Sequence, residues 1–184
     1  MVKQGKKFKK GFTIIEVVLV LAIAGLIFLM VFIALPALQR SQRNTQREDD
    51  LARFLTAVTD YQSNNNGRLP FTTGWTQTTL GTFVSRYIDN TCTGTNSGPM
   101  TCSGNQWRDP DGTVYQFEEK KPTLATGADV TVGLTGTTVD HKVYFVLGGN
   151  CGLLEGNASK GTGDRQVALF MILEGGAITC NDNQ

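Results

Sequence analysis

The chain has 184 residues, of which 40% are hydrophobic and 18% charged, so it has room for one ordinary domain and a long N-terminal element. The first eleven residues hold five lysines and no acid, which leaves 12 of the 17 basic side chains and all 16 acids in the rest. This acidic body gives no support for a nucleic-acid binder that neutralises phosphates, whereas the basic start fits a segment that stays cytoplasmic.

An uninterrupted apolar run follows this basic start. Residues 17–35 contain no charged or strongly polar side chain. As a helix, this run is roughly 28 Å long, close to the hydrocarbon thickness of a bilayer. We therefore expect it to span a membrane.

A secretory signal peptide is the first alternative for the N-terminus, because it also joins basic residues to an apolar run. The run here is too long for the apolar core of such a peptide. Its small-residue site, Ala22-Ile23-Ala24, lies inside the run and is followed by eleven more apolar residues. Glu16, at the start of the run, has no use in a signal peptide.

Glu16 also argues against an uncleaved signal anchor, the second alternative. A carboxylate at the edge of a membrane is unfavourable unless a partner compensates its charge. Cleavage between Gly11 and Phe12 creates a positively charged amine four residues before Glu16, on the same helix face. That amine, in the same chain or in a neighbour, is the partner that we expect.

The run Gly11-Phe12-Thr13-Ile14-Ile15-Glu16, after lysines and before an apolar helix, resembles the leader of type IV prepilins and pseudopilins. The resemblance implies cleavage after Gly11 by a prepilin peptidase, N-methylation of Phe12, and pairing of Glu16 with the Phe12 amine of an adjacent subunit. It also implies an assembly ATPase and a membrane platform as partners. Homologous filaments can unwind between a helix glycine and a proline, here Gly25 and Pro36; a simple kink at the membrane surface is the alternative.

The polar residues after Pro36 continue the helix. Arg40, Arg43 and Arg47 recur at helical spacing, and we expect a basic stripe that faces solvent and lipid headgroups or pairs with acids of a neighbouring subunit. An amphipathic pattern then predicts a buried helix face, and Asn66-Gly67 predicts the helix end. The apolar positions of that face are Leu51, Phe54, Leu55, Val58 and Tyr61.

Four cysteines lie after the apolar run, where an extracellular location permits disulfides. Sequence alone leaves three pairings open. We favour the local pairs Cys92 with Cys102 and Cys151 with Cys180. A zinc site is the competing interpretation, and the absence of short metal-ligand spacing disfavours it.

The C-terminal part of the chain predicts about four antiparallel strands, after a short helix over residues 82–88. The strand patterns cover residues 114–118, 130–134, 143–147 and 167–173, and Gly175-Gly176 predicts a hairpin. The fold class is therefore α+β: a long N-terminal helix packed on a small antiparallel β-sheet head. Its parts are a leader (1–11), a transmembrane and polymerisation helix (12–36), an amphipathic helix (37–62) and an extracellular head (63–184).

No catalytic set is visible. The single histidine, His141, borders a strand and is expected at the surface, and Asp109-Pro110-Asp111-Gly112 is typical of a turn, with calcium binding as the alternative. We expect no enzyme activity, no cofactor and no metal.

These features predict a pilus subunit that forms a homopolymer for adhesion, motility or DNA uptake. It is a single-pass membrane protein before assembly and part of an extracellular filament afterwards. The alternatives are a pseudopilin or minor pilin of a secretion or competence machine and, from another class, a signal-anchored receptor or enzyme. The head is the part expected to contact host cells or DNA.

Overall fold

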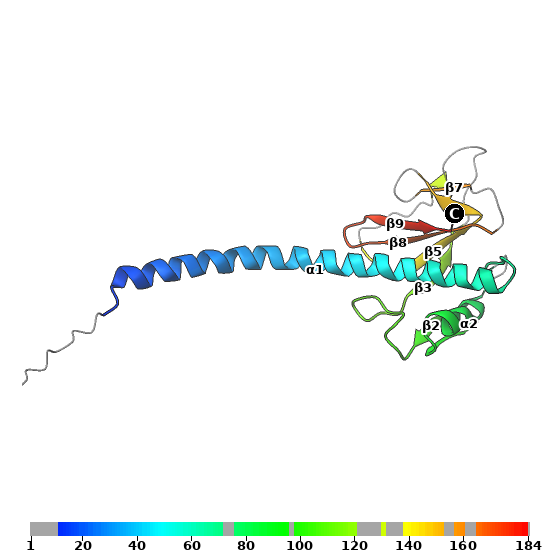
Figure 1. The fold of residues 1–184 in the computed structure, drawn as a ribbon, viewed down its shortest axis with the longest axis horizontal. Coiled ribbons are helices and arrows are strands. Elements are labelled where there is room, and N and C mark those ends of the chain that lie inside the picture. The colour runs from blue at the N-terminus through cyan, green and yellow to red at the C-terminus, as the bar shows by residue number, and fades with distance from the viewer. Residues whose placement is uncertain are drawn as a thin grey trace, which may run out of the picture. The chain divides into compact units, whose positions relative to one another are not determined.

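The computed structural model describes residues 11–71, 76–95, 98–120, 130–131, 138–152, 157–160 and 165–183. These residues form an α+β fold, as predicted, with two helices and short strands (Figure 1). The chain divides into two compact units, residues 1–41 and residues 42–184. The elements are α1 (Ile14–Asn64), α2 (Gln77–Tyr87), β1 (Cys92–Thr95), β2 (Gly98–Cys102), β3 (Gln116–Glu119), β4 (Val130–Thr131), β5 (Lys142–Leu147), β6 (Gly149–Cys151), β7 (Asn157–Lys160), β8 (Val167–Ile172) and β9 (Ile178–Asp182).

The first half of α1 is apolar and long enough to cross a membrane. The helix continues through both Gly25 and Pro36. Unwinding between these two residues, which the resemblance suggests for the assembled polymer, therefore remains a prediction about the filament.

The second half of α1 forms the centre of the unit of residues 42–184. Its predicted apolar face is confirmed: Leu51, Phe54 and Val58 are fully buried. Phe54 packs against four aromatic rings, with ring centroids 4.9–6.5 Å apart. Burial of each such side chain contributes roughly 1.5–3 kcal/mol, so this face anchors the helix in the head. The four aromatic partners are Phe71, Phe83, Trp107 and Phe117.

The end of α1 follows the predicted left-handed cap. Asn66 and Gly67 have φ angles of 55° and 76°, and the Gly67 amide donates to the Gln62 carbonyl oxygen at 2.7 Å. Asparagine and glycine tolerate this conformation better than other residues do. The helix ends at Asn64, two residues later than expected.

Helix α2 is longer than the predicted segment 82–88 because of its N-terminal cap. The side chains of Thr76 and Thr79 each accept a hydrogen bond from the backbone amide of the other residue. This reciprocal capping box satisfies amides that the first helical turn otherwise leaves unpaired. It starts the helix at Gln77.

The main sheet has the strand order β3-β5-β8-β9. Strands β5, β8 and β9 pair antiparallel, whereas β3 pairs parallel to β5, so the sheet is mixed and the prediction of a purely antiparallel sheet is wrong at this edge. Parallel pairing needs a long crossover connection, and residues 120–141 supply its length. A local sequence pattern identifies a strand but not the direction of its partner.

Both faces of the central strands are covered, which explains why β5 and β8 are continuously apolar. Side chains such as Leu169 contribute to the core around α1, and alternate side chains such as Phe170 form a second cluster on the other face. The predicted hairpin between β8 and β9 is present, but its loop has three residues, 174–176, and not the two expected, because Leu173 pairs with Ala177. Gly175 and Gly176 have φ angles of 98° and 85°, a conformation that glycine adopts at no steric cost.

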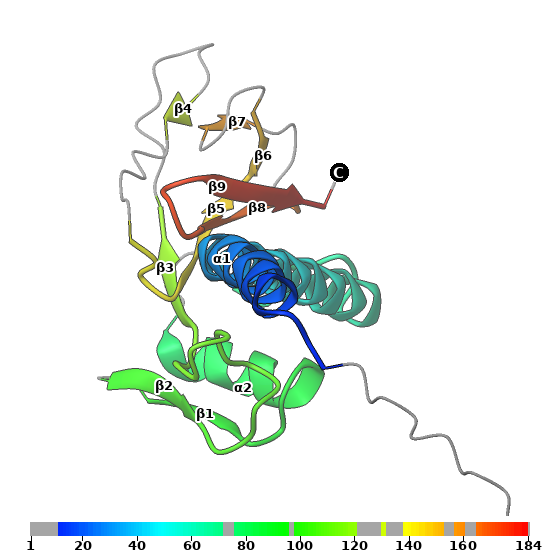
Figure 2. The same ribbon diagram turned by 90° about the vertical axis from the view of Figure 1, so that its left-hand side faces the viewer.

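Two smaller sheets complete the head: the hairpin β1-β2 and the sheet β4-β7-β6. The second half of α1 lies between the main sheet on one side and α2 with the β1-β2 hairpin on the other (Figure 2). Two disulfides join Cys92 to Cys102 and Cys151 to Cys180, the local pairs that we favoured. Cys92 and Cys102 lie directly opposite each other in β1 and β2, and the second bridge joins β6 to β9.

Candidate functional site

The start of α1 is the first candidate site. Gly11 lies outside the helix, and the Phe12 side chain is 90% exposed. The Glu16 carboxylate accepts two hydrogen bonds from Thr13, one from its backbone amide and one from its hydroxyl, both at 2.9 Å. In this uncleaved chain, Glu16 therefore has Thr13 as its partner.

Thr13 and Glu16 form a capping box at the helix N-terminus. A threonine followed three residues later by a glutamate is the sequence signature of this cap, and sequence reasoning missed it here. The helix dipole adds to the stabilisation, because it favours a negative charge in the first turn. Glu16 thus has a structural role in the single chain beside any role in assembly.

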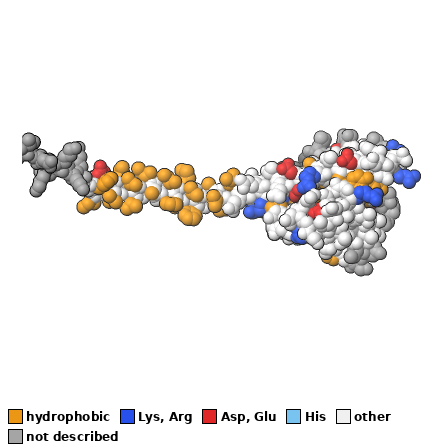
Figure 3. Space-filling view, turned by 60° about the horizontal axis from the view of Figure 1, so that its bottom comes forward, with side chains coloured by type: hydrophobic (Ala, Val, Ile, Leu, Met, Phe, Trp, Pro, Cys, Tyr) orange, Lys and Arg blue, Asp and Glu red, His pale blue; other side chains and the backbone are white. Residues whose placement is uncertain are grey.

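The apolar surface of α1 is the second candidate site. Every large apolar side chain from Phe12 to Leu38 is at least 47% exposed. Figure 3 shows these side chains covering the helix as a continuous hydrophobic surface. Contiguous apolar surfaces of this extent mark membrane or protein contacts, because water solvates them poorly. The helix therefore needs lipid or other helices around it.

Two of the three arginines of the expected stripe, Arg43 and Arg47, bind acids of the head, where we expected them to face solvent. Arg47 donates from Nε and Nη2 to the two carboxylate oxygens of Asp109, at 2.6 and 2.8 Å. Both Arg43 and Arg47 bind the Glu174 carboxylate, which lies between β8 and β9, at 2.6–2.9 Å. The expected basic stripe is therefore wrong for Arg43 and Arg47. Their partners lie 62 to 131 residues away in sequence, and helical spacing does not reveal them.

These ion pairs shift the pKa values of Glu174 and Arg47. The hydrogen bonds from Arg43 and then Arg47 lower the pKa of Glu174 from its ordinary value of 4.5 to about 2. Burial alone disfavours the charged form of Arg47, but its bonds to Asp109 and Glu174 outweigh this and raise its pKa. Both partners therefore stay ionised at neutral pH, and the network holds the β8-β9 turn against α1.

Asp50 is another buried acid, and its pKa is shifted upward, in the direction opposite to that of Glu174. Burial raises the pKa of Asp50, whereas its hydrogen bond from the Tyr115 hydroxyl, at 3.2 Å, opposes this. Arg53 contributes one further contact to the same carboxylate, at 3.2 Å. Asp50 and Tyr115 thereby connect α1 to the chain just before β3.

The predicted turn at residues 109–112 is confirmed by a hydrogen bond from the Gly112 amide to the Asp109 carbonyl oxygen, at 2.8 Å. His141 has a φ angle of 57°, and its Nε2 lies 2.6 Å from Asp111 Oδ2. Ligand-type atoms of Asp109, Asp111 and His141 lie within 4.8 Å of one another. Both oxygens of Asp109 already bind Arg47, so this group has the properties of an ion-pair network.

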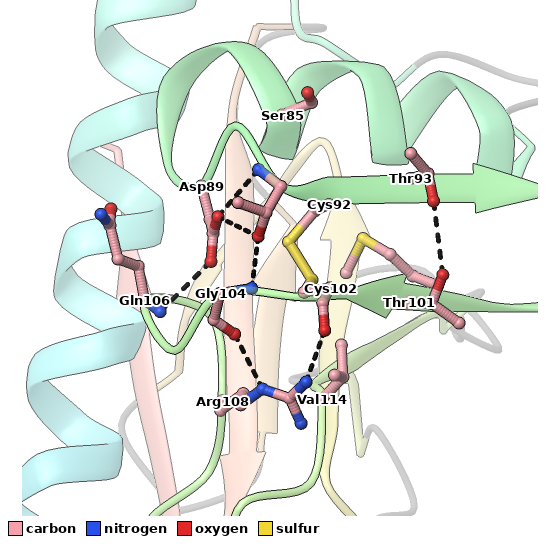
Figure 4. The surroundings of a disulfide bond; sticks show 12 residues. Ser85, Asp89, Cys92, Thr93, Thr101, Cys102, Gly104, Gln106, Arg108 and Val114 are labelled. Atoms are coloured by element: carbon pink, nitrogen blue, oxygen red, sulfur yellow. Dashed lines mark hydrogen bonds between the residues drawn. A yellow bond between two sulfur atoms is a disulfide. The ribbon is translucent and has the colours of Figure 1, made fainter.

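The surroundings of the Cys92–Cys102 disulfide are fixed by two charged side chains (Figure 4). Asp89 accepts hydrogen bonds from the Thr91 amide and hydroxyl and from the Gln106 amide, at 2.6–3.2 Å. Arg108 donates to the carbonyl oxygens of Cys102 and Gly104. These hydrogen bonds pair several backbone groups of this loop within the protein, beside the disulfide.

The comparisons with known proteins agree with the geometry at the N-terminus. The model of the prokaryotic N-terminal methylation motif matches residues 6–32, which covers four of the five N-terminal lysines, Glu16 and most of the apolar run. This motif is the signature of type IV pilins and pseudopilins. Together with the α+β layout, the match supports a type IV pilin-like or pseudopilin protein. No curated protein and no solved structure matches the chain.

Proposed function

We propose that this protein is a structural subunit of a type IV pilus. The observation that carries the proposal is the exposed apolar surface of residues 12–38, on a helix that begins inside a methylation motif. A lipid bilayer covers this surface before assembly, and helices of other copies cover it in the filament. The role is structural and involves neither catalysis nor a cofactor.

Processing prepares the helix for polymerisation. A prepilin peptidase cuts between Gly11 and Phe12, and the new amine of Phe12 is methylated, which retains its positive charge. In the filament this amine pairs with Glu16 of a neighbouring subunit. Since Glu16 already caps its own helix through Thr13, pairing in the polymer adds to that contact or replaces it. If two neighbouring helices are shifted along their axes, Glu16 no longer meets the amine and its charge stays uncompensated, so the pair favours a single axial alignment of the subunits.

The proposed parts of the chain follow from this assembly. Residues 1–11 are the cytoplasmic leader, 12–36 the polymerisation helix, 37–62 the second half of the helix and 63–184 the extracellular head. An assembly ATPase and a membrane platform move the subunit from the membrane into the filament. The head then faces outward and contacts cell surfaces or DNA.

A pseudopilin or minor pilin of a secretion or competence machine is the second candidate, since the methylation motif is shared by both groups. Abundance separates the two: a major pilin dominates filaments sheared from cells. A signal-anchored receptor or enzyme is the third candidate and predicts no polymer at all.

Glu16→Gln is the sharpest test of the assembly role. Glutamine is accepted at this position of a capping box, so the variant keeps the helix cap and removes only the charge. We expect Glu16→Gln to be inserted in the membrane and cleaved, but to yield few or no surface filaments. Glu48→Gln, which removes an exposed acid elsewhere on α1, is the matched control and assembles normally. Wild-type amounts of filament from Glu16→Gln would contradict the proposal.

A further inference from the structure

The part of α1 in the head has two exposed flanks of different character. Asp49, Arg53, Thr56 and Asp60 are spaced by four, three and four residues and therefore share one stripe of the helix. All four are exposed, and we call them the acidic flank. The face between this stripe and the head is buried by Leu51, Phe54 and their neighbours.

The acidic flank has an excess of negative charge. Its only cation, Arg53, donates to Asp50 at 3.2 Å and to the Gln106 carbonyl oxygen at 3.3 Å. Among the residues that the structure describes, neither Asp49 nor Asp60 has an ion-pair partner. Two carboxylates, roughly 16 Å apart along the helix axis, are therefore unpaired in the single chain.

A polar pocket lies beside a neighbouring face of the same helix. It has a volume of about 490 Å³ and contains one charged side chain, the guanidinium of Arg165. The three pocket residues on α1, Ser63, Thr59 and Gln62, lie about 60°, 100° and 160° around the helix axis from Asp60, so the pocket and the acidic flank are separate surfaces. The pocket is lined by Thr59, Gln62, Ser63, Gly67, Arg165, Gln166 and Asn183.

Hydrogen bonds hold this pocket in shape. Gln62 donates to the Arg165 carbonyl oxygen at 2.7 Å, and Asn183 donates to the same oxygen and to the Gln62 side chain, both at 2.9 Å. Gly67 leaves room for the guanidinium, because a Cβ at this position would lie 2.7 Å from Arg165 Nη1. In the described part of the chain, the Arg165 guanidinium has no ion-pair partner either.

We propose that the acidic flank of one copy docks into the Arg165 pocket of the next copy. This inference rests on the proposed filament. A helical polymer uses two different surfaces of each subunit, and each must complement the other. The guanidinium matches a carboxylate in charge and in its paired donors, and Asp49 and Asp60 are the unpaired carboxylates of the acidic flank. The contact joins heads side by side and adds to the contacts between the apolar helices.

Charge reversal tests the contact. Arg165→Glu alone, and Asp49→Arg with Asp60→Arg, each replace attraction by repulsion, and we expect at least about a fivefold loss of sheared filaments because every subunit contact is affected. Combining the three substitutions restores the attraction and recovers filaments. Arg86→Glu, an equal charge change at an exposed position on α2, is the matched control and assembles normally. Normal filaments from Arg165→Glu, or no recovery in the combined variant, would overturn the proposal.

A direct measurement identifies the partner residue. Arg165→Lys keeps the charge and permits zero-length carbodiimide cross-linking to a carboxylate of the adjacent subunit. We expect the Arg165→Lys variant to give, in purified filaments, a cross-linked peptide that joins the substituted position to Asp49 or Asp60 of another copy, and its absence would overturn the contact. These outcomes are all judged against wild-type filaments. If the wild-type chain forms none, the proposed function itself fails, and the two failures are thereby distinguished.

Discussion

Arg47 and Asp109 form a two-pronged ion pair that is almost completely shielded from water, with side-chain exposures of 2% and 0%. The pair joins α1 to the turn before β3, and Glu174 extends it to the turn between β8 and β9. Two segments far apart in the sequence are thereby fixed to one helix. The head depends on this buried charge in addition to its apolar core.

Removing one member of this pair should strongly destabilise the protein. Arg47→Ala leaves the Asp109 carboxylate buried without its partner, and such a loss typically costs about 3–5 kcal/mol in the free energy of unfolding. Arg53→Ala, at a half-exposed ion pair, should cost less than about 1 kcal/mol. Chemical denaturation of both variants in detergent micelles measures the difference. Equal losses for the two variants would be inconsistent with a buried anchor.

The lowered pKa of Glu174 predicts a defined pH dependence. Because its pKa falls from 4.5 in the unfolded chain to about 2 in the folded one, its ion pairs stabilise the fold fully above pH 4.5. This contribution decreases as the pH falls from 4.5 towards 2. Thermal unfolding of wild type and Glu174→Gln across this range tests the prediction.

The two proteins should differ most in Tm near neutral pH and converge as the pH approaches 2. Asp111, whose pKa is also lowered to about 2 by hydrogen bonds from Thr113 and by His141 against the effect of burial, is unchanged in both. A constant difference at every pH would contradict the assignment.

The two disulfides should differ in their contributions. Cys151–Cys180 closes a loop with a sequence separation of 29, and Cys92–Cys102 one of 10. The loop-closure model then assigns about 3.6 kcal/mol to the first and about 2.7 kcal/mol to the second. We expect the double serine variant at Cys151 and Cys180 to unfold at lower denaturant than the one at Cys92 and Cys102. If the variant at Cys92 and Cys102 unfolds at the lower denaturant concentration instead, the packing around this buried bridge outweighs the loop-closure entropy.

Sequence predicted those parts of the fold whose signals are local. The end of α1 follows from Asn66 and Gly67, and the β8-β9 hairpin from Gly175 and Gly176, because each demands a backbone conformation that few other residues adopt. The parallel pairing of β3 with β5 has no local signal.

In the candidate sites too, local sequence signals could be recognised and contacts between distant segments could not. The methylation motif is contiguous and was found from sequence, whereas the partners of Arg43 and Arg47 are set only by the tertiary fold. The helical spacing of the arginines on α1 is readable from sequence, but the burial of Arg47 depends on turns 62 and 127 residues away. Thr13 is the exception: its capping box with Glu16 was visible in the sequence and was missed.

The most direct test of the central claim is the mass of the mature N-terminus, measured on protein from filaments sheared off the cell surface. The account predicts a polypeptide that begins at Phe12, carries one additional methyl group on its amine and lacks residues 1–11. Filament-derived protein that retains its lysines, or begins at any other residue, would contradict it.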